Sequence, residues 1–276
     1  MGLNKKDLQK KADHIRCKVV EVAVKNNAGH IAPSLSCADI LTALYYSVMS
    51  YKKDDPLRES RDRLVFSKGH GCYALYAILA DKGIMPETEW DNFYTGASNL
   101  SGCVERRPEY GLEASCGSLG HGLPIATGIA FGAKLLNKKY YTFCVMGDGE
   151  MQEGTTWEAL QFAVKHGLGR LIVIVDANRL QAMDFITNIL DKKPTDKIKR
   201  LQGFGLSPVV CPGHDVNKLV KALNAAKRSQ SDKPKVIVAE TTKGFGLKCM
   251  ENIAKFHFRI PTKEELLKEP DYGRGK

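Results

Sequence analysis

The chain has 276 residues, and its length suits one large α/β domain. Because 43% of the residues are hydrophobic and 26% are charged, the composition predicts a packed core and excludes a disordered chain. The net charge of +10 favours anionic partners such as phosphorylated metabolites or a diphosphate cofactor, but no basic block with interleaved aromatic residues indicates nucleic-acid binding.

The first part of the chain is predicted to be mainly helical. Apolar spacing over residues 7–26 predicts a first helix, which Gly29 and Pro33 should end. Ser36 is expected to be the N-cap of a second helix over residues 37–49. The segment RDRLVFSKGHGCYALYAILADKG predicts a strand at 64–66, a glycine-rich turn and a helix that ends at Gly83. Residues 84–116 are expected to form a long surface loop, a feature typical of functional regions.

Strands and helices alternate in the rest of the chain. The loop GSLGHGL opens a helix rich in small residues, and the strand YYTFCVM, a Gly-Asp-Gly turn, a helix over 155–166 and the strand RLIVIVDA follow. A strand in LSPVVC, a helix in DVNKLVKALNAAKRS and a strand in PKVIVAETT precede a charged, loop-rich tail over 250–276. The pattern predicts one α/β domain over 1–276, with a parallel sheet covered by helices on both faces and ligands at the carboxyl ends of its strands.

The sequence shows no signal for export or for membrane insertion, and no cysteine pattern typical of a zinc site or a disulfide framework. The N-terminal segment is charged and amphipathic, and no run approaches the roughly 18 apolar residues of a membrane span. The eight cysteines contain no C-x-x-C pair, so we expect reduced thiols rather than a zinc ribbon or a disulfide framework. The chain is therefore predicted to be cytoplasmic and not bound to a membrane.

Polar side chains end two consecutive predicted strands. Asp148 lies between Gly147 and Gly149 after the first strand, and Asn178 follows the second. The glycines allow a ligand to approach the backbone closely, and the following helix N-terminus favours an anion. Two oxygen ligands beside an anion site suit Mg²⁺ that also binds diphosphate oxygens. Each residue alone has a structural alternative: Asp148 could cap the helix, and Asn178 could form an Asx turn.

Residues 147–178 resemble the thiamine diphosphate fingerprint, in which GDG is followed by a helix, a strand and an asparagine. The motifs GHIAPSLSCADILTALYY, FSKGHGCYALYAIL, GLEASCGSLGHGLPIATGIA, GDGEMQEG and TTKGFGLKCMEN occur in the order found in the N-terminal half of transketolases. The similarity covers nearly all of residues 10–265. It implies the thiamine diphosphate-binding fold, and the chain resembles the N-terminal subunit of transketolases that are split into two polypeptides.

The resemblance implies the site residues. Asp148, Asn178 and the carbonyl of Leu180 would hold Mg²⁺, or Ca²⁺ or Mn²⁺, and the thiamine diphosphate would contact the loop residues Gly147 and Gly149. The remaining cofactor contacts would come from Gly117, Ser118, Leu119, His70 and His257, and the catalytic residues would be His30, His70, Glu153 and His257. The role of His121, where many relatives have Gln, stays open.

For five further charged residues, a functional role is compared with simple exposure to solvent. Glu150 is expected to be solvated, and Lys243 and Lys248 are expected at the surface. Arg106 and Arg107 could bind an anionic group or could equally be solvated.

The sequence departs from the family in one loop. Cys103 and Val104 stand where transketolases commonly have a His-Pro pair that contacts the donor sugar. Since a thiol is a poor hydrogen-bonding substitute for an imidazole, we expect either a donor other than xylulose 5-phosphate or another path for this loop.

The glutamate that activates the cofactor belongs, in this family, to a pyrimidine-binding domain that would follow Lys276. We therefore expect an α₂β₂ assembly with a C-terminal transketolase subunit, which acts on sugar phosphates by transfer of a two-carbon ketol unit.

The motifs leave other functions open. A transketolase-like subunit that acts on a modified sugar and the α-subunit of a 2-oxo acid dehydrogenase share the GDG and asparagine pattern. Outside enzymes, a scaffold or a basic nucleic-acid binder could keep the same fold, although neither would need the pair of Asp148 and Asn178.

Overall fold

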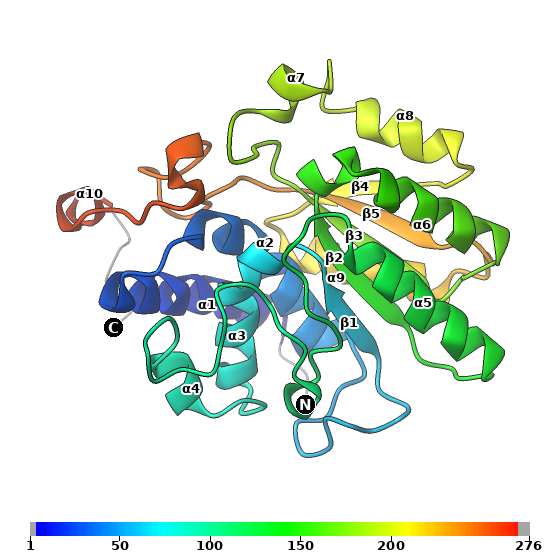
Figure 1. Cartoon of the computed structure of the whole chain (residues 1–276), viewed down its shortest axis with the longest axis horizontal. Coiled ribbons are helices and arrows are strands. Elements are labelled where there is room, and N and C mark those ends of the chain that lie inside the picture. Colours follow the sequence, from blue (N-terminus) through cyan, green and yellow to red (C-terminus); the bar gives the residue numbers. More distant parts are fainter. Residues whose placement is uncertain (1–3, 270–276) are drawn as a thin grey trace.

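The computed structural model describes residues 4–269 (Figure 1). Its sheet has five strands in the order β1-β2-β3-β5-β4, and every neighbouring pair is parallel. The strands are β1 (Arg63–Phe66), β2 (Thr142–Gly147), β3 (Leu171–Ala177), β4 (Val209–Pro212) and β5 (Lys235–Glu240). All residues of β3 are buried, as expected for the centre of a sheet with helices on both sides. The predicted fold class is confirmed.

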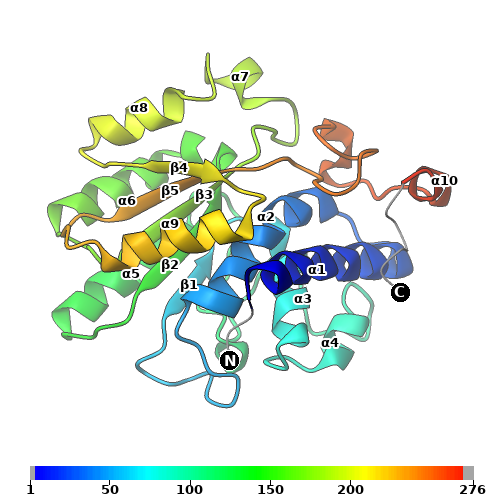
Figure 2. The same ribbon diagram turned by 180° about the vertical axis from the view of Figure 1, so that it is seen from behind.

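Helices cover both faces of the sheet. On one face α5 (Gly122–Leu135) packs against α6 (Gly154–Lys165), and on the other α2 (Ile31–Ala43) packs against α9 (Val216–Arg228) (Figures 1 and 2). Outside α2 lie α1 (Lys5–Asn26) and α3 (Cys72–Asp81). The shorter helices are α4 (Glu87–Asp91), α7 (Ile186–Ile189), α8 (Asp196–Gly203) and α10 (Lys263–Leu267).

The start of α2 differs from the prediction. The helix begins at Ile31, so Ser36 is not its N-cap, and a π-helical segment, Leu44–Val48, continues it. Pro33 is tolerated because the N–H groups of a first helical turn have no intrahelical acceptor. The Ser36 hydroxyl instead donates to Asp176 in the core, at 2.7 Å.

The segment Ile31–Val48 is long and apolar enough to cross a membrane, contrary to the expectation that no run approaches this length. Within the protein, 89% of that segment is buried. Its composition is explained by its position in the core, between the sheet and α1.

The sheet is not covered equally everywhere. The side chains of Val209 and Val210 on the edge strand β4 are 51% and 48% exposed. The edge strand β4 is thus partly open to solvent, whereas the four other strands are largely buried. Because all strands are parallel, the segments after β1, β2, β3 and β5 meet at one edge of the sheet.

Candidate active site

A cavity of about 670 Å³ lies at the carboxyl ends of the strands. Most of the predicted site residues line it, and they come from separate segments of the chain. Those that line the cavity are His30, His70, Gly117, Leu119, Gly147, Asp148, Gly149, Glu153, Asn178, Leu180 and His257. Ser118 lies in the exposed loop beside it.

Asp148 and Asn178 lie at the ends of the neighbouring strands β2 and β3. The Asp148 carboxylate accepts a hydrogen bond from the Arg179 amide at 2.9 Å and lies 3.5 Å from the Lys197 ammonium. It makes no capping bond to the 3₁₀ turn that follows it, so the capping alternative is not supported. Asn178 Oδ1 accepts from the Leu180 amide at 3.1 Å, so the Asx turn is present. An Asx turn leaves an Oδ1 lone pair for a further partner.

The residues present fit a hard cation and its anionic ligand. The Lys243 side-chain nitrogen donates to the carbonyls of Leu180 and Gln181 at 2.9 and 3.0 Å, so the Leu180 carbonyl oxygen already accepts a donor inside the cavity. Among the described residues no group of three His, Cys, Asp or Glu side chains could hold a metal alone. A metal ion would therefore need phosphate oxygens as further ligands.

Two amide groups in the same cavity have no protein partner. The Nε2 atoms of Gln152 and Gln181 are buried without a hydrogen bond, although both side chains line the cavity. Buried donors are normally satisfied, so these two groups indicate a ligand that accepts hydrogen bonds.

Three histidines form one cluster in the cavity. The ring of His30 lies 5.8 Å from that of His70 and 5.4 Å from that of His257, and the last two are 5.3 Å apart. Burial lowers the pKa of His30 and, with Lys68, holds the pKa of His70 well below its usual range. Burial and the Lys243 charge lower the pKa of His257 to about 3. All three imidazoles are therefore neutral near pH 7 and able to accept or donate protons.

Backbone geometry brings this histidine cluster together. His30 has a left-handed backbone (φ 62°) directly before α2 and makes no side-chain capping bond, so a capping role is not supported. At Gly29 a Cβ atom would lie 2.3 Å from the Phe258 carbonyl. Only glycine there lets the segment carrying His257 approach α2 this closely.

Glu150 is not solvated, so that prediction is wrong. Its side chain is buried, and the carboxylate accepts from the Ser67 hydroxyl at 2.6 Å and from the amides of Gly147 and Gly120 at 2.9 and 3.0 Å. Glu150 thus ties together three loops of the cavity. Glu153, by contrast, is exposed at the N-cap of α6, at the cavity wall.

Lys243 is not at the surface, which corrects a second prediction. Its side chain is 1% exposed, and its ammonium contacts His257 Nδ1 at 2.6 Å. Burial and the nearby Lys68 lower its pKa to about 7. Lys248 is exposed, as predicted.

A buried ion pair below the cavity was missed by the sequence analysis. Lys68 pairs with Asp176, and Asp176 also accepts from the hydroxyls of Ser36 and Thr241. The available signal was the single carboxylate of Asp176 within the otherwise apolar strand β3. The pair fixes the ends of β1, β3 and β5 relative to one another.

His214 was also missed. Its Nε2 accepts a hydrogen bond from the Thr242 amide at 2.8 Å, so Nδ1 carries the proton and donates to Asp39 at 2.9 Å. The ring stacks on Phe245 at 3.5 Å. These contacts hold the loop that carries Lys243 into the cavity.

The divergent loop contributes one thiol. Cys103 lines the cavity and is half-buried, and all eight cysteines of the chain are free. Neither Arg106 nor Arg107 lines the cavity, and Arg107 lies near Glu105 and Glu109. His121 is exposed and contacts the Leu119 carbonyl at 3.0 Å.

The chain is similar to known proteins over almost its whole length. The family described as "Transketolase, thiamine diphosphate binding domain" matches residues 8–268. The chain is 36% identical to an apulose-4-phosphate transketolase subunit of Actinobacillus succinogenes, over 96% of this chain and 95% of that protein. It is 34% identical to human transketolase, over 91% of this chain and 39% of that protein. The transketolase structure from Campylobacter jejuni superposes with a TM-score of 0.88 at 30% identity, over 98% of this chain and 43% of that one.

Proposed function

Because the chain belongs to the transketolase family, where it corresponds to the thiamine diphosphate binding domain, we propose that it is the diphosphate-binding subunit of a two-chain transketolase. The enzyme would transfer a two-carbon ketol unit from a ketose phosphate to an aldose. The chain spans about two fifths of the length of the solved transketolases that it matches, so the complete activity is part of this proposal.

The observation that carries this proposal is the oxygen set at the carboxyl ends of β2 and β3. Asp148, Asn178 Oδ1 and the Leu180 carbonyl would bind Mg²⁺, or Ca²⁺ or Mn²⁺, together with diphosphate oxygens. Lys243 would then turn from the Leu180 carbonyl towards the diphosphate, since two cations cannot share one carbonyl closely. Gln152 and Gln181 supply free amide donors in the same cavity.

When bound, thiamine diphosphate would supply a carbon nucleophile for the ketose carbonyl and accept the electron pair of the adjacent carbon–carbon bond. The role of this chain is to bind and to position. The neutral imidazoles of His30, His70 and His257 would exchange protons with sugar hydroxyls, because each can donate with one nitrogen and accept with the other. Glu153, exposed at the cavity wall, would reach towards a partner chain.

We propose a companion C-terminal subunit that carries the pyrimidine-binding domain, in an α₂β₂ assembly located in the cytoplasm. Two relatives of matching length are named as one lettered subunit of an apulose-4-phosphate transketolase, which supports a two-chain enzyme. The sugar in those names makes apulose 4-phosphate a candidate substrate. Cys103 in the cavity wall, in place of the family histidine, favours a donor other than xylulose 5-phosphate.

Thermal unfolding tests the proposal. Thiamine diphosphate with Mg²⁺ should raise the Tm of the chain mixed with its companion, and ketol transfer should need both chains. Robust turnover by the isolated chain would contradict the two-chain proposal. Absence of any Tm shift in the assembly would contradict cofactor binding and favour a non-catalytic scaffold.

A further inference from the structure

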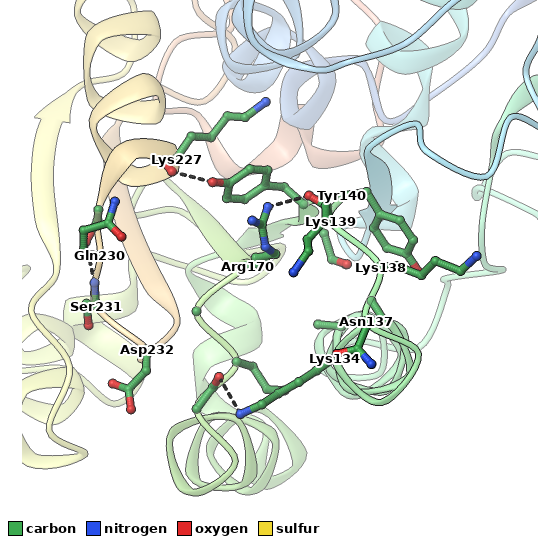
Figure 3. Close-up of a pocket in the computed structure, with 18 residues that line it drawn as sticks. Lys134, Asn137, Lys138, Lys139, Tyr140, Arg170, Lys227, Gln230, Ser231 and Asp232 are labelled. Carbon is green, nitrogen blue, oxygen red and sulfur yellow. Dashed lines mark hydrogen bonds between the residues drawn. The ribbon is translucent and has the colours of Figure 1, made fainter.

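A second cavity, of about 340 Å³, lies at the amino-terminal end of the sheet (Figure 3). It is formed by the end of α5, the turn between α6 and β3, and the segment after α9. We call it the basic cavity, because its lining contains one carboxylate, Asp232, and the cations Lys134, Lys138, Lys139, Arg170 and Lys227.

Some of these cations already have partners. Lys138 pairs with Glu59 at 2.6 Å, and Lys227 pairs with Asp62 at 3.0 Å. The Lys134 ammonium donates to the carbonyls of His166 and Gly167, at 2.6 and 3.2 Å. Those carbonyls hold the Lys134 side chain in place without neutralising its charge.

Arg170 and Lys139 are different, because neither has a carboxylate partner. The Arg170 guanidinium donates to the backbone carbonyl of Lys139, and both residues line the basic cavity (Figure 3). Within the part of the chain that the structure describes, no Asp or Glu oxygen lies within 4.0 Å of either cation. An anion in the basic cavity would therefore meet two cations that no carboxylate of the described residues neutralises.

A neutral donor lines the same cavity. Thr142 is almost fully buried, and its hydroxyl has no hydrogen-bond partner. A buried hydroxyl is normally satisfied, and an anionic oxygen in the cavity would accept its proton. The cavity volume is near the lower end for small-molecule sites, which suits a small ester rather than a dinucleotide.

We propose that the basic cavity binds a small phosphorylated metabolite, whose phosphate group is held by Arg170 and Lys139. Arginine binds phosphate through two parallel N–H donors, and a neighbouring ammonium adds a second charge. The site is separate from the active-site cavity, because Thr142 begins β2 and Gly147 ends it, about 17 Å further along the strand. The proposal does not depend on the proposed enzymatic function.

Titration calorimetry at constant ionic strength tests this site, with inorganic phosphate and ribose 5-phosphate as probes. The double variant R170Q/K139Q should weaken binding of both probes at least tenfold. A matched control is R106Q/K165Q, which removes the same charges from exposed side chains outside the cavity and should bind like the wild type. The variant D148N should also bind normally, which separates this site from phosphate binding at the active-site cavity.

The single variant K139Q guards against misfolding, because the Lys139 ammonium has no hydrogen bond or ion pair within the described residues. This variant should have the Tm of the wild type and should still bind both probes more weakly than the wild type does. Tighter binding of ribose 5-phosphate than of phosphate would support a metabolite, and equal binding would reduce the proposal to a site for inorganic phosphate. Absence of saturable binding to the wild type, or unchanged binding to R170Q/K139Q, would overturn the proposal.

Discussion

Replacing Asp148 with Asn should separate cofactor binding from stability. The change removes the one anionic side chain of the proposed metal ligands. Burial is the largest influence on this carboxyl, and it raises the pKa of Asp148 even though Lys197 lies 3.5 Å away. A raised pKa means that the folded state favours the protonated form, so the ionised group lowers stability as the pH rises through that pKa. A neutral amide avoids this cost and can still accept from the Arg179 amide.

The expected magnitudes follow from binding and unfolding thermodynamics. Cofactor at about 100 times its Kd stabilises the protein that binds it by about 2.7 kcal/mol. With about 2.1 cal/mol/K of unfolding entropy per residue, the 276 residues give roughly 0.6 kcal/mol/K, so the Tm should rise by about 5 °C. D148N should lose most of this rise, while the stability of the unliganded variant should stay within about 1 kcal/mol of wild type or exceed it.

Differential scanning fluorimetry, with and without thiamine diphosphate and Mg²⁺, measures both quantities on the chain and on its assembly with a companion. The matched control is D54N, the same chemical change at an exposed aspartate, which should keep both the stability and the shift. A wild-type shift in D148N would refute the assignment of the metal ligand. A loss of several kcal/mol in the unliganded variant would refute the electrostatic reasoning.

Three further changes probe the neighbouring groups. K243M should weaken cofactor affinity about tenfold, because a charge-assisted hydrogen bond to phosphate is lost, and calorimetry would measure it. The pKa of Lys243 is lowered to about 7 in the folded protein, so between about pH 7 and 10 only the unfolded state keeps this proton. The free energy of unfolding of the unliganded wild type should therefore rise with pH over this range. Urea unfolding should show a smaller rise in K243M. H214F should destabilise the protein by about 1–3 kcal/mol, since it leaves the Thr242 amide without its acceptor, and hydrogen exchange should quicken at residues 242–246, whereas H214Q should restore part of the protection. C103H should shift the ratio of kcat/KM values towards xylulose 5-phosphate over apulose 4-phosphate in the assembled enzyme, and an unchanged ratio would remove Cys103 from substrate selection.

The fold was largely predictable because its strands are short apolar runs and its long helices have clear apolar spacing. The start of α2 was not, since Gly29 and Pro33 resemble helix breakers. In the structure Pro33 lies in the first helical turn, where its missing N–H costs little. The exposure of β4 was not predictable either, because the sequence VV does not show that the strand lies at a sheet edge.

The site was predictable where residues end strands, as at Asp148 and Asn178, because parallel strands bring their ends together. Burial of single charged residues was not predictable, since it depends on segments distant in the chain. Glu150 is satisfied by Ser67 and Gly120, and Lys243 by the carbonyl of Leu180. The same holds for His214, which joins α2 to the loop after β5.

The free thiol in the cavity wall also gives reactive compounds a target inside the cavity. Burial raises the pKa of the Cys103 thiol, but its side chain is only half-buried, whereas five other cysteines are buried. Electrophiles and mercurial compounds that enter the cavity would therefore meet sulfur where related enzymes present nitrogen. Inhibition by such compounds that decreases when a ligand occupies the cavity would distinguish this chain from transketolases with histidine at that position.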